Sequence, residues 1–328
     1  MAAPPAAALV PAPEPPLRIG ISSCLVGEPV RWDGDHRRSA FVTDRLAPLV
    51  VLHPVCPEVG IGLGVPREPI RLVAREGSVR AQGVNDPQQD VTAALRAYGR
   101  TMVRELPELH GYLFKRDSPS CGLARVEVHR ERGGRPARRG VGIYAGEIVA
   151  CEPLLPVVEE GHLDDPILRE HFIERVFACY RWKRLLAEGL TLPRLVAFHE
   201  HHKLALMAHG AEPLRRLGRF VAGAAGLPPA KLAARYGPAF TALLARPATP
   251  RGHGNVLFHL MSYLKRHLDA ADKAELTELI HAFRRGLVPR AAPMALLTHH
   301  FRRHPHPYVA GQVYLNPHPA ELLLRSAP

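Results

Sequence analysis

The chain is poor in cysteine and has no long apolar run. Only five of its 328 residues are cysteine, an odd number and fewer than a disulfide-stapled secreted domain uses. No apolar stretch approaches the roughly 18 residues that a membrane-spanning helix needs. Residues 1–17 have no basic region, and their prolines would interrupt the apolar core of a signal peptide. We therefore expect a cytoplasmic protein with a mobile Pro/Ala tail at residues 1–17, in which clustered cysteines are ligands or catalysts.

The basic charge of the chain is unevenly distributed. The net charge is +12, of which residues 18–160 carry +2 and residues 191–310 carry +11. The second segment also holds 12 of the 19 histidines. Such a segment is typical of a protein that binds a polyanion, above all a nucleic acid, although a coding bias towards arginine would give the same composition.

Two kinds of hydrophobic pattern divide the sequence. Before residue 160, short apolar runs alternate with helical spacing, which predicts an α/β N-terminal domain with an open, mostly parallel sheet. A helix is expected at 90–106, and strands are expected at 17–22, 49–55, 70–74, 111–114 and 141–144. After residue 190 the spacing is almost purely helical and begins at Thr191, a suitable N-cap, which predicts an all-α C-terminal domain. The expected divisions are a tail (1–17), a catalytic domain (18–160), a connecting helix (161–190), a basic helical domain (191–310) and a second tail (311–328).

Three cysteines share one local setting. Cys24, Cys56 and Cys121 each follow an expected strand, directly or after a short turn, among small or turn-forming residues. The carboxyl ends of parallel strands face one crevice, so these thiols can converge although they lie far apart in the sequence. Three thiolates would suit an iron–sulfur cluster, zinc or copper(I), and would leave one coordination position open, as catalytic sites do. Three buried structural cysteines would show the same spacing.

The residues around these cysteines resemble a known family. Four blocks within residues 18–160 are similar to the thiouracil desulfidase family: GISSCLVGEPVRWDG, HPVCPEVGIGLGVPREPIRLV, DVTAAL and FKRDSPSCG. The helical part resembles the domain of unknown function of YbgA-type bacterial proteins, through LVAFHEHHKLALMAHG, RGHGNVLFHLMSYLKRHLDAADK and HPHPYVAGQVYLNPHP. The two domains in this order look like those of tRNA 4-thiouridine desulfidases.

This resemblance implies a cofactor and a reaction. The cofactor would be a 4Fe–4S cluster with three cysteine ligands, Cys24, Cys56 and Cys121, and one open iron. A soft thiocarbonyl sulfur would bind that iron, which would act as a Lewis acid while water replaces the sulfur without net redox change. Glu58 would move protons, unless its carboxylate only accepts backbone N–H bonds. Ser118 or Ser120 would orient water or the substrate ring, unless both hydroxyls serve only the local turn.

The basic helical domain carries the expected contacts to RNA. Phosphate binding by its cations would give the strong salt dependence of nucleic-acid complexes, although solvated helix faces and core histidines would explain each residue taken singly. The expected nucleic-acid-binding residues are His199, His202, Lys203, Arg215, Arg216, Arg219, Arg251, Lys265 and Arg266. We therefore expect a desulfidase that acts on 4-thiouridine in tRNA. The alternatives are a desulfidase of free thiouracil, and a non-enzymatic nucleic-acid-binding protein with a structural zinc.

Overall fold

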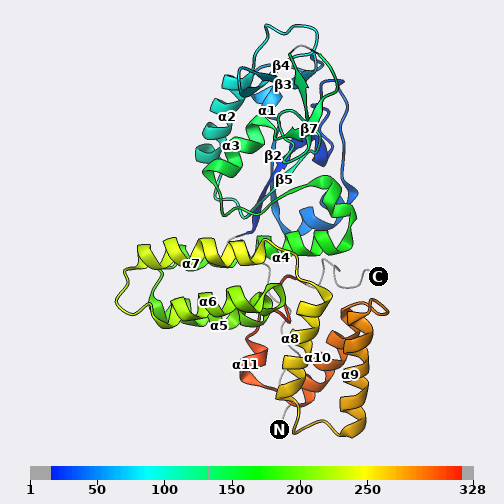
Figure 1. Cartoon of the computed structure of the whole chain (residues 1–328), viewed down its shortest axis with the longest axis vertical. Helices are drawn as coiled ribbons and strands as arrows, with labels where there is room; N and C mark the ends of the chain where they lie inside the picture. The colour runs from blue at the N-terminus through cyan, green and yellow to red at the C-terminus, as the bar shows by residue number, and fades with distance from the viewer. Residues whose placement is uncertain (1–15, 132, 320–328) are drawn as a thin grey trace. The chain divides into compact units, whose positions relative to one another are not determined.

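The structure is a computed structural model that describes residues 16–131 and 133–319. Within that part the chain divides into two compact units, residues 16–172 and residues 173–319 (Figure 1). The division falls inside helix α4 (Pro166–Ala187), where the sequence predicts a connecting helix. Most of the tail expected at residues 1–17, and the end of the tail expected at 311–328, lie outside the described residues.

A four-stranded parallel sheet forms one part of the first unit. Its strands lie in the order β2 (Val51–Val55), β1 (Arg18–Ser22), β5 (Gly111–Phe114) and β8 (Val157–Glu159). All four residues of β5 are buried, as are the last four of β1. Near-continuous burial of this kind is typical of central strands in a parallel sheet. Three of these strands, β1, β2 and β5, lie where the sequence predicts them.

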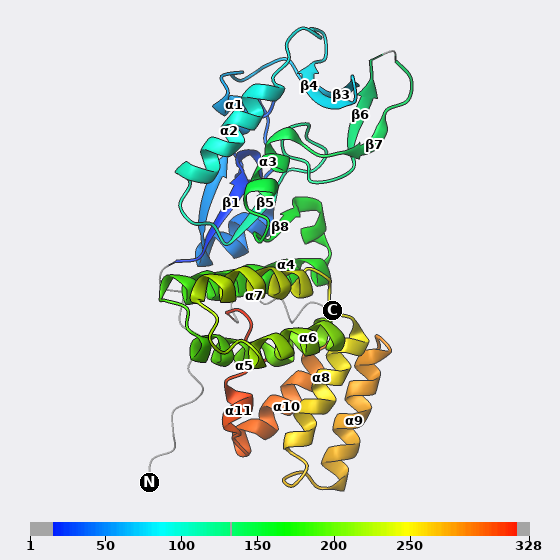
Figure 2. The same ribbon diagram turned by 60° about the vertical axis from the view of Figure 1, so that its left-hand side comes forward.

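A second four-stranded sheet lies in the same unit, apart from the first (Figure 2). Its strands lie in the order β4 (Ser78–Gly83), β3 (Ile70–Arg75), β6 (Val126–Arg130) and β7 (Ala137–Gly140). β3 pairs with β6 in parallel, whereas the β3–β4 and β6–β7 pairs are antiparallel. The sequence pattern predicts β3 but does not distinguish a second sheet.

The prediction of a strand at residues 141–144 is wrong. Gly142 is instead the extended N-cap residue of helix α3 (Ile143–Cys151). A four-residue apolar run cannot be told from the start of a buried helix by its period alone, and here the apolar pattern continues to Ile148. α3 packs beside α2 (Thr92–Glu105), the helix that the sequence predicts at 90–106 (Figure 1).

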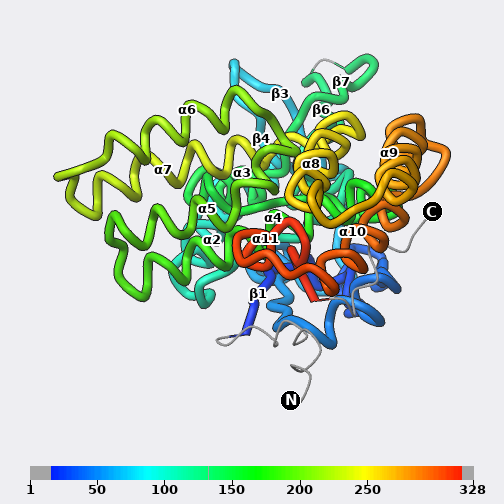
Figure 3. The backbone as a smooth tube through the Cα atoms, turned by 90° about the horizontal axis from the view of Figure 1, so that it is seen from below, coloured from blue at the N-terminus to red at the C-terminus, as the bar shows by residue number. Residues whose placement is uncertain are grey.

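The second unit is entirely helical in its described residues. After the end of α4 it contains α5 (Leu192–His209), α6 (Ala211–Ala222), α7 (Pro229–Leu244), α8 (Pro250–Tyr263), α9 (Ala270–Arg284), α10 (Ala291–Arg303) and α11 (Pro307–Ala310). One core cluster joins α5, α6 and α7 around Tyr236 and Phe240, and another joins α8, α9 and α10 around Leu257 and Leu297. Figure 3 shows the backbone course of these helices. The Thr191 hydroxyl accepts a hydrogen bond from the Arg194 N–H at 3.4 Å, so the predicted N-cap of α5 is present.

The fold is therefore an α/β unit with a parallel sheet followed by an all-α unit, as the sequence predicts. Across residues 16–131 and 133–319, no helix combines the length and the apolar character that are needed to cross a bilayer.

Candidate active site

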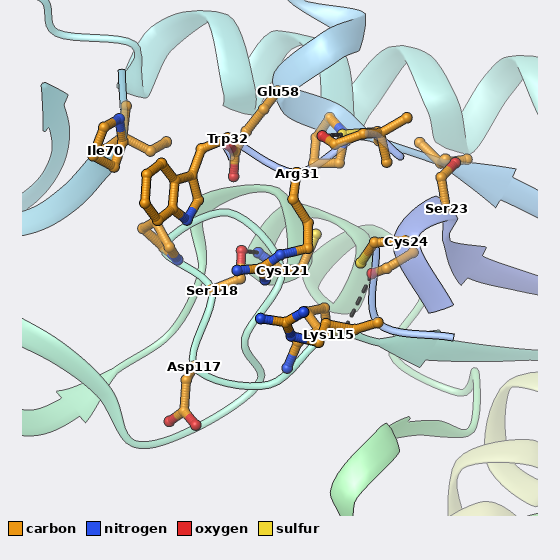
Figure 4. A pocket seen from close by; sticks show the side chains of 18 of the residues that line it. Ser23, Cys24, Arg31, Trp32, Glu58, Ile70, Lys115, Asp117, Ser118 and Cys121 are labelled. Atoms are coloured by element: carbon orange, nitrogen blue, oxygen red, sulfur yellow. Dashed lines mark hydrogen bonds between the residues drawn. The ribbon is translucent and has the colours of Figure 1, made fainter. Parts of the chain in front are cut away.

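Cys24, Cys56 and Cys121 line one cavity of about 410 Å³ in the first unit (Figure 4). Cys24 lies in the 3-10 turn η1 (Ser23–Val26) after β1, and Cys56 is the N-cap residue of the short helix α1 (Pro57–Gly60) after β2. Cys121 lies in the turn that follows β5. Because β2, β1 and β5 are parallel neighbours, their carboxyl ends bring the three thiols to one edge of the sheet.

Helix α3 holds the turn that carries Cys121. The backbone N–H groups of Ile143 and Ala145 donate hydrogen bonds to the carbonyl oxygens of Pro119 and Ser120, each at 3.0 Å. A Cβ atom at Gly142 would lie 2.6 Å from the backbone carbonyl of Ser120, so this close approach requires glycine. The helix that replaces the expected strand at 141–144 therefore has a direct role in placing the third cysteine.

The protein alone holds the three thiols in their protonated form. Burial raises the pKa of Cys24 to about 11, and burial is also the main reason why the pKa values of Cys56 and Cys121 are raised. Negative charge on Cys56 raises the pKa of Cys24 further, and charge on either of these two raises that of Cys121. Metal ligation needs thiolates, so a group that binds here must offset both burial and mutual repulsion with positive charge.

The donor set fits an iron–sulfur cluster. Three cysteine thiolates are the soft ligands that such clusters take, and three protein ligands leave one iron without one. Zinc also accepts thiolates, through bonds of about 2.3 Å. In the described ranges no three His, Cys, Asp or Glu side chains are grouped closely enough to hold a single metal ion.

The Glu58 carboxylate is fixed at both of its oxygens. Arg67 donates to Oε2 from Nε at 2.9 Å and from Nη2 at 2.8 Å, and the Ser120 hydroxyl donates to Oε1 at 2.8 Å. The Glu58 and Arg67 side chains are 13% and 5% exposed, so water screens this ion pair little. The carboxylate is therefore tied to side chains from two other segments, and not to the backbone N–H groups of its own turn.

The two candidate serines have different surroundings. Ser118 lines the cavity, and its hydroxyl oxygen accepts the N–H groups of Ser120 and Cys121 at 3.2 and 3.1 Å. Ser120 is fully buried and points to Glu58. Ser118 can therefore present its hydroxyl hydrogen to a ligand in the cavity, whereas Ser120 acts on Glu58.

Two cavity residues, Lys115 and Trp32, are not among the site residues that the sequence predicts, and a third, Arg67, lies in a family-like block where a contact to substrate or a structural ion pair is expected. The Lys115 ammonium bonds to Glu160 and lowers the pKa of Cys24, against the larger effect of burial. Arg67 holds Glu58, and Trp32 stands at the mouth of the cavity. Trp32 occurs in the block GISSCLVGEPVRWDG and Lys115 in the block FKRDSPSCG, where a tryptophan among turn-forming residues and a lysine after a buried strand are the available signals.

A groove of about 770 Å³ lies in the helical unit, and its lining combines Lys203, Arg215 and Arg251 with Glu200 and several apolar side chains. Four of the expected nucleic-acid contacts line it, from helices α5, α6 and α8: His199, Lys203, Arg215 and Arg251. Arg216 and Arg219 are exposed on α6, where both approach Glu212. Lys265 and Arg266 are exposed just after α8 and outside the groove lining.

His202 lies in the core and not in the groove. Its side chain is buried, and its Nδ1 is 2.8 Å from the Phe198 carbonyl oxygen. Burial lowers the pKa of His202 to about 3, with the charge of Arg181 as the second cause, so the ring is neutral at physiological pH. We therefore leave His202 out of the RNA contacts.

Both parts of the chain match known protein families. Residues 19–160 match the family described as 2-thiouracil desulfurase, and residues 203–319 match the family described as protein of unknown function (DUF1722). The uncharacterized protein YbgA of Escherichia coli (strain K12) is 34% identical over 152 residues, which are 46% of this chain and 90% of that protein. A solved structure, the [4Fe-4S]-dependent thiouracil desulfidase TudS, is 28% identical over 45% of this chain and 94% of its own, with a TM-score of 0.34.

The matches define a protein in which a 2-thiouracil desulfurase domain precedes a DUF1722 domain. The chain belongs to the YbgA family.

Proposed function

We propose that this protein is an iron–sulfur-dependent desulfidase of thiolated pyrimidines and that its substrate is 4-thiouridine in tRNA. The observation that carries the proposal is the meeting of three cysteines, Glu58 and Ser118 around one cavity. The match of residues 19–160 to the 2-thiouracil desulfurase family supports the same chemistry. We propose the cytoplasm as its location, since five cysteines are few for a disulfide-stapled secreted protein.

Cys24, Cys56 and Cys121 would be the ligands of the cluster. When bound, a 4Fe–4S cluster with three protein ligands supplies a Lewis-acidic iron with affinity for the soft sulfur of a thiocarbonyl. The overall change replaces C=S by C=O, consumes one water and releases hydrogen sulfide, so no electrons are gained or lost. The residues of the chain must therefore hold the ring, orient the water and move protons.

Glu58 is the proton carrier in this proposal. Its carboxylate accepts a proton from the attacking water and returns it as the sulfur leaves. Arg67 on one oxygen and Ser120 on the other keep the carboxylate in a single orientation, so little reorganisation is needed during the reaction. Ser118, which faces the cavity, orients the water or the ring.

The charge distribution supports tRNA over a free base. Residues 18–160 carry a net charge of only +2 and offer little attraction for a polyanion, whereas residues 191–310 carry +11. Lys203, Arg215 and Arg251 around the helical groove would contact phosphates. A free thiouracil has no phosphate, so a desulfidase of that base would not need such a groove.

The test begins with anaerobic purification and quantitation of iron and sulfide. We expect about four irons per chain, as a single 4Fe–4S cluster requires. Sulfide release is then measured from tRNA that contains 4-thiouridine, and from free 2-thiouracil and 4-thiouracil. A higher kcat/KM for tRNA supports the proposed substrate. A higher value for a free base favours the alternative, a desulfidase of free thiouracil. A zinc-loaded protein that releases no sulfide from any of them contradicts the proposal.

A further inference from the structure

Trp32 is an exposed aromatic residue at the cavity that holds the cysteines. Its side chain is 46% exposed, and it lines the cavity together with Glu58, Ser118 and Cys121. In the view of Figure 4, the Trp32 indole and Ile70 lie on one side of the cavity and Cys24 lies on the other. The indole therefore presents apolar, planar surface to any ligand that enters from solvent.

The backbone that carries Trp32 is fixed on both sides. The Gly34 N–H donates to the Arg31 carbonyl oxygen at 3.0 Å, and the Arg67 N–H donates to the Trp32 carbonyl oxygen at 3.0 Å. The guanidinium of Arg31 also pairs with Asp33 at 3.2 Å. The indole is thus held near the cavity by its backbone, although its own ring is not packed into a core.

Trp32 is not a buried core residue, because its side chain is 46% exposed. No other aromatic ring contacts the Trp32 indole anywhere in residues 16–131 and 133–319. The other tryptophan, Trp182, is 3% exposed and packs against Phe198 and Tyr236. A single exposed apolar side chain is ordinary on a protein surface. Trp32 differs because its position is fixed and because it borders the site of the proposed chemistry.

We propose that Trp32 is a stacking platform for the pyrimidine ring of the substrate, which makes it a specificity-determining residue for planar bases. This inference rests on the proposed function. A base in folded RNA is stacked on its neighbours, and it must leave that stack to reach a buried centre. An indole that already stands at the entrance replaces the lost stacking. Pro69 and Ile70 line the same cavity and extend its apolar surface.

Fluorescence tests the contact without catalysis. Uridine is the probe, because it has the pyrimidine ring but no sulfur to lose. The chain has two tryptophans, so Trp182→Phe leaves Trp32 as the only indole. Uridine should quench the fluorescence of that full-length, anaerobically purified variant, and it should not quench Trp32→Phe, in which only Trp182 remains. If Trp182→Phe does not fold, the difference between the unmodified protein and Trp32→Phe gives the same answer. Absence of quenching contradicts the proposal.

Kinetics separates stacking from simple apolar contact. Trp32→Leu should raise KM for 4-thiouridine on the order of tenfold with little change in kcat, because base–aromatic stacking has about this effect when it is removed. Trp32→Phe and Trp32→Tyr keep an aromatic face, so their KM should stay close to that of the unmodified protein. Ile167→Ala, at an apolar residue that is 67% exposed and does not line the cavity, is the matched control and should change nothing.

The outcomes distinguish this inference from the function on which it rests. If the unmodified protein releases sulfide and Trp32→Leu has the same KM, the stacking role is wrong and the desulfidase assignment stands. If KM rises equally in Trp32→Phe and Trp32→Leu, the indole does not act through an aromatic face, and the proposal is again wrong. If the unmodified protein releases no sulfide from any thiolated pyrimidine, the proposed function fails, and the inference fails with it.

Discussion

The two units of the chain place their candidate functional residues in different ways. In the α/β unit, Cys24, Cys56 and Cys121 come from three strand ends that are far apart in the sequence, and each is largely shielded from water. In the helical unit, Lys203, Arg215 and Arg251 are exposed on three helices around a groove. The first arrangement depends on sheet topology, and the second on the faces of individual helices.

This difference predicts different sensitivities to substitution. No nearby side chain can replace a buried cysteine ligand or a carboxylate that is hydrogen-bonded at both oxygens. The loss of either should therefore abolish cluster binding or catalysis. An exposed cation is one of many, so its loss should weaken binding by a graded amount. The four predictions that follow test this contrast, beginning with the largest expected effect.

Cys24→Ala, Cys56→Ala and Cys121→Ala should each lose the bound iron and all desulfidase activity. Two thiolates and an alanine cannot offer the three ligands that the cluster would need. Iron quantitation after anaerobic purification measures the loss. Cys151→Ala is the control, because Cys151 is exposed at the end of α3 and does not line the cavity. Retention of iron by any of the three variants would contradict the ligand assignment.

Glu58→Gln should keep its iron and lower kcat by roughly 10² to 10⁴, the usual contribution of a general acid–base group. Glutamine preserves the shape of the side chain but cannot carry the proton. Single-turnover sulfide release measures the effect. Glu105→Gln, at an exposed acid near the end of α2, should behave like the unmodified protein. A Glu58→Gln variant with full activity would remove Glu58 from the mechanism.

Neutralising the groove should weaken tRNA binding and its dependence on salt. A Lys203→Gln, Arg215→Gln, Arg251→Gln variant should reduce the slope of log K against log salt by about 3, because each phosphate contact contributes roughly 0.9. The matched control removes the same charge outside the groove with Lys231→Gln, Lys273→Gln and Arg285→Gln. Equal slopes for the two variants would show that the groove has no special role.

His202 should make the helical unit less stable in acid. Its pKa is about 3 in the folded chain because burial disfavours the imidazolium, and it is near 6.5 when unfolded. The unfolded state therefore binds a proton first as the pH falls below about 6.5, so stability is full above that pH. The loss from this group should reach about 2 kcal/mol at pH 5, since one pKa unit is worth 1.36 kcal/mol.

The measurement is urea unfolding at pH 7 and pH 5, followed by the fluorescence of Trp182 in a Trp32→Phe background. His202→Asn keeps an N–H donor for the Phe198 carbonyl and should lose less stability on acidification than its parent. His201→Asn, at the exposed neighbouring position, should lose as much stability between pH 7 and pH 5 as its parent does. Identical pH dependence in His202→Asn and in its parent would contradict the buried neutral histidine.

The sequence predicts those features that local pattern or composition determines. Strands β1, β2 and β5 are apolar runs with turn residues after them, and Thr191 caps a helix with evident periodicity. The parallel arrangement of those strands is what places the three cysteines together. The position of Glu58 beside Cys56 in a family-like block predicts it as a site acid, and the structure places its side chain in the lining of the same cavity.

Other features depend on contacts that sequence pattern does not encode. Residues 141–144 read as a strand because four apolar residues fit either structure, and only packing against the Ser120–Cys121 turn makes them the start of a helix. Ser118 and Ser120 are alike in sequence, but one faces the cavity and the other faces Glu58. His202 shares a helix face with His199, and burial alone separates them.

The wide separation of the three cysteines along the chain also determines when the centre can form during synthesis. Cys24 leaves the ribosome long before Cys121, and the turn that holds Cys121 is completed only when α3 has emerged. A nascent chain that ends before α3 therefore has all three thiols but lacks the hydrogen bonds from Ile143 and Ala145 that hold the Cys121 turn. Insertion of the proposed cluster therefore requires that the α/β unit has been made and folded as far as α3.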